Sequence, residues 1–477
     1  MKVGRPLAGT KESFLREKWQ KANFSFGNFQ QKNEQCHYEI LQKKEIKMKQ
    51  SIHRLFLLLV ACLMILSIQV GVGAQEKVTL QFVNIQSDPH MKPLIQAFEI
   101  EHPNVLVKVQ TLPWRDYFTA METALGSASD TPDAMEIDVP LNASYAVRGF
   151  TLPLDEYLDK EDLKDFVKPS IDASTWGGEV YSIPRQTSAQ LLYYNVDLFN
   201  EYGLEPPSKE IEGRWTWKKV VEAAKKLTID LDGDGTTNIW GFAFDQVDRP
   251  YQLLPLPQSL GEPMLGPDSL TTTGYVDSET SIKAGKFYYD LFNTWKIAPK
   301  GVVAGETTEI FASGQIGLFV GGEWNRYTYD REYPEFNWSA SAHPYFEGGK
   351  MATPTGSWHV SVNRHSKYIK EAVALVTYLT NRPMSVLWYA MHGQMPVRKS
   401  VYTFYEEHFD TFPNNLLYYD FLNTAVPRVL TPGYREWELN VEKAYADIRV
   451  GVKPEVALKE AAQKIDRMLK KYESLMK

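Results

Sequence analysis

An acidic segment near the middle of the chain has the spacing of a metal-binding loop. In DLDGDGTTNIWGF, residues 230–242, three aspartates stand at alternate positions and a glycine is sixth. This pattern is the first half of an EF-hand calcium loop, whose turn directs carboxylate oxygens inward. The twelfth position is Gly241 and not the bidentate glutamate that completes such a site. A calcium site and an acidic turn without an ion both remain open, and the candidate ligands are Asp230, Asp232, Asp234, Thr236 and Asn238.

A tryptophan that follows a wholly apolar segment indicates a binding surface. Residues 311–324, FASGQIGLFVGGEW, predict the end of a helix, an apolar strand over 316–320, a Gly-Gly turn and then Trp324. In open α/β sheets, ligands bind beyond the carboxyl ends of the strands, where loops are free to carry specific groups. We therefore expect Trp324 to lie at that edge of a sheet and not beneath a helix.

The common sequence motifs of catalysis are absent. The chain contains no HExxH motif, no Gly-x-Ser-x-Gly elbow and no phosphate-binding loop. Its two cysteines, Cys36 and Cys62, precede residue 75, so the downstream chain can hold neither a disulfide nor a thiolate metal site. Cysteine catalysis is thereby excluded downstream. The seven histidines after residue 74 show no metal-binding spacing.

The elements that must position these residues alternate between strand and helix. Apolar patterns predict strands over 77–86, 105–110 and 133–139, with helices over 90–103 and 114–127 between them. This alternation predicts an α/β fold with a mainly parallel sheet. Further helices are predicted after Thr216, a candidate N-cap, over 369–380 and over 454–477. The last of these carries a single apolar stripe formed by Leu458, Ala462, Ile465, Leu469 and Tyr472.

Length and charge narrow the class of protein. A chain of 477 residues predicts two or three folding units, which leaves room for a cleft between them. Residues 1–74 hold 12 of the 52 Lys and Arg residues and 5 of the 59 Asp and Glu residues, so the remaining chain has a formal charge of −14. Nucleic-acid binding is therefore not expected.

The N-terminal region predicts export. Residues 48–74 combine a basic start, an apolar stretch and small residues that end at Ala74, which is the pattern of a cleaved secretory signal peptide. Residues 1–47 precede the better start at Met48, and we interpret them as a misassigned leader. Residues 59–62, LVAC, resemble a lipobox, so lipidation at Cys62 is the alternative to cleavage after Ala74. We expect a periplasmic or extracellular protein.

Six segments in order resemble the extracellular solute-binding proteins of carbohydrate ABC transporters, family 1, which include the maltose-binding protein. The resemblance covers nearly all of residues 77–475. It rests on TPDAMEIDVPLNASYAVRGFTLPLDEYL, YSIPRQTSAQLLYYNVDLFNEYGLEPP with the following TWKKVVEAAKKLT, FASGQIGLFVGGEW, TGSWHVSVNRHSKYIKEAVALVTYLT, GQMPVRKSVY and GVKPEVALKEAAQKI.

The resemblance implies a two-lobed periplasmic-binding-protein fold, type II-like, with hinge crossings between the lobes. By analogy, lobe 1 comprises residues 75–187 plus 343–393, and lobe 2 comprises residues 188–342 plus 394–477. It further implies that a sugar or oligosaccharide is held between the lobes and presented to ABC permease subunits in the membrane. We expect a monomer that requires no cofactor, apart from the possible calcium.

The resemblance also implies which aromatic residues contact the ligand. Trp324 matches the family's sugar-stacking tryptophan, and core packing is the alternative. Trp358 lies beside a crossing, where it either contacts ligand or wedges the hinge. Trp437, with its neighbours Tyr434 and Arg435, matches another stacking position, although a packing role is the alternative.

Polar candidates follow the predicted strands and the first crossing. Asn84 and Gln86 follow the first strand, and Asp138 with Asn142 follow the third; loop capping is the alternative for all four. At the crossing lie Gln186 and Arg185, whose guanidinium could bind vicinal hydroxyls or pair with an acid.

Two other functions remain open. Aromatic clefts also serve glycosidases, which need two carboxylates, and the candidates near the predicted cleft are Glu136, Asp138, Glu323 and Glu438. The same fold could instead bind a peptide or another non-sugar solute.

Overall fold

The structure is a computed structural model that describes residues 77–476, except residues 87, 355 and 357. The predicted leader, the signal peptide and the lipidation site at Cys62 lie outside the described residues. Within the described chain, none of the helices combines the length and apolar character needed to cross a membrane.

Five strands form the first sheet, in the order β2-β1-β3-β12-β6. Strand β1 lies between β2 and β3 and is parallel to both, as the alternation of strand and helix predicts. The three strands predicted in this part of the chain are therefore confirmed. The bounds are β1 (Val78–Asn84), β2 (Val105–Thr111), β3 (Ala134–Asp138), β6 (Ile183–Pro184) and β12 (Trp358–Val362).

Four strands form the second sheet, in the order β10-β7-β9-β8. Here only β8 and β9 are parallel, and β7 runs antiparallel to both of its neighbours. The bounds are β7 (Gln190–Asn195), β8 (Trp240–Phe244), β9 (Ile316–Gly322) and β10 (Trp338–Ala342). Two short pairs complete the strands, β4 (Thr175–Trp176) with β5 (Glu179–Val180) and β11 (Thr353–Pro354) with β13 (Ala425–Val426).

The prediction of parallel neighbours is correct for β2, β1 and β3 and for the pair β8 and β9, and wrong for the other pairings in the two sheets. Strand β12 runs antiparallel to β3 and β6, and β10 runs antiparallel to β7. A parallel neighbour requires a crossover connection, usually a helix. Among the residues that the structure describes, no helix lies between β6 and β7, or between β10 and β12, where the chain passes from one sheet to the other.

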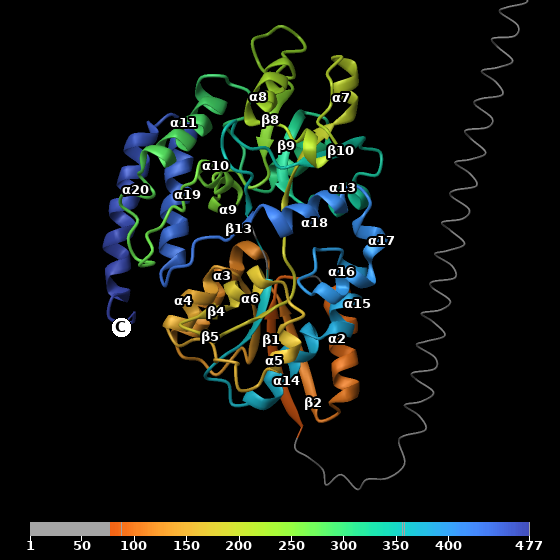
Figure 1. Ribbon diagram of the computed structural model, residues 1–477, viewed down its shortest axis with the longest axis vertical. Helices are drawn as coiled ribbons and strands as arrows, with labels where there is room; N and C mark the ends of the chain where they lie inside the picture. Colours follow the sequence, from red (N-terminus) through yellow and green to blue (C-terminus); the bar gives the residue numbers. More distant parts are fainter. Residues whose placement is uncertain (1–76, 87, 355, 357, 477) are drawn as a thin grey trace, which may run out of the picture. The chain divides into compact units, whose positions relative to one another are not determined.

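Helices cover both sheets (Figure 1). Those that pack with the first sheet or its helices include α2 (Asp88–Glu101), α3 (Trp114–Gly126), α4 (Leu141–Val147), α5 (Lys160–Leu163), α6 (Lys168–Ser174), α14 (Ile369–Thr380) and α15 (Arg382–His392). Around the second sheet lie α7 (Val196–Glu201), α8 (Trp217–Lys226), α9 (Pro250–Leu253), α10 (Pro255–Ser259), α12 (Glu306–Ala312) and α13 (Asn325–Glu332).

Three long helices pack side by side (Figure 1). They are α11 (Glu279–Asn293), α19 (Tyr434–Val450) and α20 (Pro454–Leu469). The stripe predicted over 454–477 is confirmed, because its four members on α20 and Tyr472, which lies in η2 (Lys470–Tyr472), are all buried. The helix predicted over 369–380 matches α14. Thr216 is the N-cap residue of α8, but its side chain does not bond to the helix. The remaining helices are α16 (Lys399–Phe404), α17 (Glu406–Phe409), α18 (Asn414–Asn423) and η1 (Ile211–Gly213).

Two apolar clusters form the core, and each contains residues of both sheets. On β7, Leu191 and Tyr193 belong to one cluster, whereas Leu192 and Tyr194 belong to the other. Successive side chains of a strand point to opposite faces of its sheet. Each cluster therefore lies against one face of both sheets.

The segments that pass between the sheets lie next to one another and are joined by hydrogen bonds. Thr187 N donates to Met395 O at 2.8 Å, and Gln190 N donates to Thr353 Oγ1 at 3.2 Å. These segments supply residues to the cavity described below. The residue boundaries predicted for the two lobes stay a prediction.

Gly241 of β8 allows the sheet to approach helix α8 closely. A Cβ at this position would lie 1.9 Å from the Ala224 carbonyl oxygen, whereas a Cβ at Gly126 would meet nothing within 4 Å. We expect Gly241→Ala to lower the free energy of unfolding by about 2 to 3 kcal/mol, since backbone must move to admit the methyl group. Gly126→Ala, the matched control in α3, should stay within about 1 kcal/mol of the parent. Urea unfolding measures both; equal stabilities would contradict the close approach.

Candidate functional site

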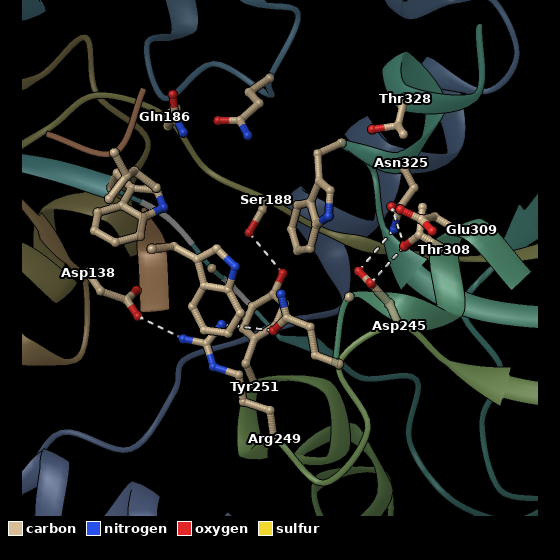
Figure 2. A pocket seen from close by; sticks show the side chains of 18 of the residues that line it. Asp138, Gln186, Ser188, Asp245, Arg249, Tyr251, Thr308, Glu309, Asn325 and Thr328 are labelled. Atoms are coloured by element: carbon tan, nitrogen blue, oxygen red, sulfur yellow. Dashed lines mark hydrogen bonds and ion pairs between the residues drawn. The ribbon is translucent and has the colours of Figure 1, made fainter. Parts of the chain in front are cut away.

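A cavity of about 440 Å³ opens where strands of both sheets end and the crossing segments pass. Asp138 ends β3, Asp245 follows β8, and Trp324 follows β9. Figure 2 shows these walls with many of the side chains that line them. The lining consists of Ile85, Trp114, Asp138, Gln186, Ser188, Asp245, Gln246, Arg249, Tyr251, Gly305, Thr308, Glu309, Trp324, Asn325, Thr328, Glu332, Tyr333, Gly356, Trp358, Gln394 and Arg428.

Trp324 lies at the edge of the second sheet, as the sequence predicts, and its indole is half-buried. Its ring centre lies 5.9 Å from that of Tyr251, with 33° between the ring planes. The Tyr251 hydroxyl is 2.9 Å from Ser188 Oγ on the first crossing (Figure 2). Trp324 therefore presents part of an aromatic surface to the cavity while its other contacts fix its position.

The two glycines before Trp324 do not form the predicted turn, because β9 continues through Gly322 and neither glycine has a positive φ. A Cβ at Gly322 would lie 2.2 Å from the Trp324 ring, and a Cβ at Gly321 would lie 2.6 Å from Asn325 Nδ2. The glycines are needed because the indole and the following helix lie directly against the strand.

A second aromatic group faces the cavity from the first sheet. Trp358 begins β12 opposite Asp138, and its ring packs edge-on against Tyr117 at 5.4 Å and stacks with Phe118 at 6.2 Å. Trp114 begins α3, immediately after β2, and also lines the cavity. Trp358 and Trp114 are both half-buried, so each has ring surface available to a ligand.

Buried charges join the two sides of the cavity. Arg428, which follows β13, donates through both terminal nitrogens to the Asp138 carboxylate of the first sheet. Arg249, which precedes α9, lies 3.5 Å from Asp138 and 3.5 Å from Glu438 of α19. Although burial opposes ionisation of Glu438, Arg249 and Arg435 hold its pKa below the ordinary value. The guanidinium of Arg249 also lies 5.0 Å from the Trp114 ring centre. This network bridges the two sheets at the cavity.

Asp245 carries a carboxylate with no ion pair to any described residue. Asn325 Nδ2 donates to it at 3.0 Å and Thr308 Oγ1 donates to it at 3.2 Å (Figure 2). The Trp324 side chain also contributes a hydrogen bond. Burial raises the pKa of Asp245 even though these donors act in the opposite direction. Asp245 therefore links β8, α12 and α13 to the indole of Trp324.

Four of the eleven predicted ligand-binding residues line the cavity, namely Trp324, Trp358, Asp138 and Gln186. Gln186 is almost fully buried, and its side-chain oxygen accepts a hydrogen bond from Trp388 Nε1 at 2.8 Å.

The structure places Trp437 in the core and not in the cavity. Its side chain is fully buried, and its Nε1 donates to Met264 O at 3.2 Å. Tyr434 is also fully buried and bonds to Glu438. Arg435 pairs with Glu438 and lies 4.6 Å from the Phe118 ring centre. The ligand contact predicted for these residues is corrected to a packing role, because α19 directs this face toward α4, α9 and α20.

The other predicted polar residues are buried beside the cavity without lining it. Arg185 donates to Glu136 at 2.6 Å and lies over Trp388 at 3.7 Å, so it pairs with an acid as the alternative interpretation has it. Asn84 accepts a hydrogen bond from Thr111 at 3.0 Å, and Gln86 and Asn142 are also buried. Arg185 and Asn84 therefore bond to other protein groups, whereas neither side-chain polar atom of Asn142 has a hydrogen-bond partner among the described residues.

Sequence reasoning missed Trp114, Asp245, Arg249, Tyr251, Gln394 and Arg428. Trp114 and Asp245 each follow a strand, so the reasoning that identified Trp324 could have found them. The two arginines and Tyr251 lie in loops and a short helix, where no periodic pattern marks them.

The three aspartate side chains of the acidic loop lie close together, as their spacing predicts. Ligand oxygens of Asp230, Asp232 and Asp234 lie within 4.8 Å of one another, and all three residues are exposed. Both oxygens of Asp230 accept backbone N–H groups, and Asn238 Oδ1 accepts Leu231 N at 2.6 Å. Carboxylate and amide oxygens suit calcium, so the residues present fit the ion in type while lacking the bidentate glutamate.

The fold and the cavity define a two-lobed solute-binding protein. Residues 84–384 match the family described as bacterial extracellular solute-binding protein, and the chain belongs to this family. The resemblance and the two-lobed α/β fold predicted from the sequence are thereby confirmed.

Relatives extend over most of the chain. A putative binding protein of Brucella abortus is 24% identical over 423 residues, which cover 87% of this chain and 98% of that protein. The multiple sugar-binding protein of Streptococcus mutans is 24% identical over 69% of this chain and 77% of its own length. An ABC substrate-binding protein of Listeria monocytogenes, solved in complex with cycloalternan, has a TM-score of 0.72 at 21% identity and covers 83% of this chain and 100% of its own.

Glu323, which precedes Trp324, predicts a pH dependence of stability. Its side chain is fully buried, its Oε2 accepts Ala189 N at 3.1 Å, and burial raises its pKa from 4.5 to about 7. Between these values the unfolded chain loses the proton while the folded chain keeps it, so stability falls as pH rises. The free energy of unfolding falls by about 3 kcal/mol between pH 4.5 and pH 7 for this reason.

We expect Glu323→Gln to remove this part of the pH dependence. Urea unfolding at several pH values measures it, with Glu460→Gln on the exposed face of α20 as the control for a lost charge. Parallel stability curves for the parent and Glu323→Gln would contradict the assignment.

Proposed function

We propose that the protein binds a sugar or oligosaccharide between its two lobes and delivers it to a membrane permease of the ABC type. The observation that carries this proposal is the cavity, in which the half-buried indoles of Trp114, Trp324 and Trp358 are bordered by amide, hydroxyl and carboxylate groups. Sugars have apolar C–H faces and a rim of hydroxyls, so flat aromatic surfaces with polar edges suit them. Relatives named for sugar binding support the proposal.

Aromatic contacts alone do not account for tight binding. If each indole buries about 60 Å² against a sugar, it contributes roughly 1.5 kcal/mol, and three contribute roughly 4 to 5 kcal/mol. Micromolar affinity requires about 8 kcal/mol. Hydrogen bonds and closure of the lobes supply the difference. A ligand that contacts both lobes only when they are closed shifts the open and closed populations toward the closed state.

The four carboxylates considered for a glycosidase are not placed for hydrolysis. Of the four carboxylates considered for a glycosidase, Glu136, Glu323 and Glu438 are fully buried and do not line the cavity. Asp138 does line it, but both of its oxygens bond to Arg428. A hydrolase needs one carboxyl group free to protonate the leaving group and a second to attack or to activate water. None of the four is placed in such a pair, and the relatives named as binding proteins support our proposal that the protein binds its ligand without turnover.

Location and partners follow from the family and the N-terminal sequence. The family is extracellular. We propose export directed by residues 48–74, with cleavage after Ala74 or lipidation at Cys62 as the two routes to the mature protein. We also propose that the protein is a monomer when it binds the permease.

Trp324→Ala tests the sugar site. We expect the variant to bind its saccharide about tenfold more weakly or worse, since it loses the stacking surface. The melting temperature of the ligand-free protein should change little, because Trp324 is only half-buried. Thermal shift against a panel of di- and trisaccharides identifies the ligand, and calorimetry measures the affinity.

The control is Trp437→Phe, which alters a fully buried indole outside the cavity. This variant should melt at a lower temperature yet keep its saccharide affinity. A large drop in the melting temperature of ligand-free Trp324→Ala would mark Trp324 as a core residue.

We also propose that the loop formed by Asp230, Asp232, Asp234, Thr236 and Asn238 binds calcium. Three convergent carboxylates without a bidentate glutamate predict weak affinity, with Kd of about 10⁻⁴ to 10⁻³ M. Millimolar calcium should raise the melting temperature of the parent, and magnesium should do so less. Asp232→Asn should abolish the effect. An identical melting temperature with calcium and with a chelator would show an acidic turn without an ion.

A further inference from the structure

The charged residues of the cavity are distributed unequally between its walls. Six charged side chains line it, four carboxylates and two guanidiniums. Asp245 lies inside the cavity, and Glu309 and Glu332 are exposed on α12 and α13 beside it. Among the side chains that the structure describes, none of these three carboxylates forms an ion pair with Lys, Arg or His. The wall built by α12 and α13 is therefore acidic.

Both arginines of the cavity are engaged by acids already present. Arg428 is almost fully buried and uses both terminal nitrogens on Asp138. Arg249 donates to Gln246 at 2.8 Å and lies 3.5 Å from each of two carboxylates, on Asp138 and Glu438. Arg428 Nε has no hydrogen-bond partner among the described residues, but it is buried, so a ligand carboxylate or phosphate would reach a guanidinium here only by displacing one of these acids. Breaking a buried pair in this way leaves an uncompensated charge, which is strongly unfavourable.

The acidic wall repels an anion in the same cavity. Glu309 and Glu332 face solvent, so salt weakens their effect, whereas Asp245 is almost fully buried and is screened less. The neighbouring side chains Thr308, Asn325 and Thr328 are uncharged and can form hydrogen bonds with hydroxyl groups. This wall suits a hydroxylated ligand without negative charge.

We propose that this cavity selects uncharged saccharides and excludes those that carry carboxylate or phosphate groups. The inference rests on the proposed function, since it names the class of sugar that the same site accepts. The residues that determine this specificity are Asp245, Glu309 and Glu332, together with the two arginines that Asp138 and Glu438 neutralise.

The test compares two ligands that share one sugar skeleton, of which one is charged and the other is neutral. The tightest neutral saccharide from the panel is oxidised at its primary hydroxyls to the uronate, and part of this product is converted to the methyl ester. The uronate and its ester have the same skeleton, and only the uronate is charged. Calorimetry should show the uronate binding at least about tenfold more weakly than its methyl ester, with a gap that narrows at high salt.

Variants test whether the acidic wall causes this difference in affinity between the uronate and its ester. In Glu309→Gln/Glu332→Gln the ratio between the two affinities should fall severalfold. The control Glu205→Gln/Glu460→Gln removes the same net charge at exposed positions outside the cavity and should keep the parent ratio. The ratio of the two affinities is compared because a general loss of binding lowers both affinities and leaves their ratio unchanged.

Three outcomes separate the two proposals. Equal affinities for uronate and ester overturn the charge selectivity and leave the sugar-binding function intact. An equal fall of the ratio in the control variant overturns the assignment to the wall of α12 and α13. Failure of every neutral saccharide to bind overturns the proposed function and this inference together.

Discussion

The buried pairing of Asp138 with Arg428 is the interaction on which the cavity depends. It joins the last residue of β3 in the first sheet to the segment that follows β13, and Arg249 and Glu438 extend the network to α9 and α19. Removing two charges from water is costly, and a buried pair gives a net benefit only when its geometry is good and its remaining donors are bonded. Here the pair holds the segment after β13 against the end of β3, beside the cavity that Trp114, Trp324 and Trp358 line.

The acidic residues at this cavity have two different roles. Asp138 and Glu438 neutralise the arginines, whereas Asp245 receives only uncharged donors. Its position between Asn325, Thr308 and the Trp324 side chain makes it a support for the aromatic surface. Gly321 and Gly322 have a related role, because a side chain at either position would occupy space that the indole or Asn325 needs. The position of the Trp324 indole thus depends on Asp245 and on the two glycines of β9.

Much of the fold could be predicted from local sequence patterns. The alternation of strand and helix identified β1, β2 and β3, and the 3.6-residue period identified α14 and the buried stripe of α20. Trp324 was found because the strand before it is wholly apolar. The antiparallel strands β7 and β12 could not be found in this way, since their direction depends on how the chain crosses between sheets. Likewise, the resemblance to the family implied a stacking role for Trp437 as well as for Trp324, and only tertiary packing shows that the Trp437 ring is enclosed. Arg249 and Arg428 meet Asp138 across more than 100 residues of chain, a distance that no local pattern reports.

The two apolar clusters have a consequence for folding. Each cluster draws residues from both sheets, so apolar contacts continue from one lobe to the other. A fragment limited to one lobe would expose to water the apolar side chains that the other lobe covers. Loss of apolar contacts in one lobe would therefore also reduce the stability of the other, so the stabilities of the two lobes are coupled.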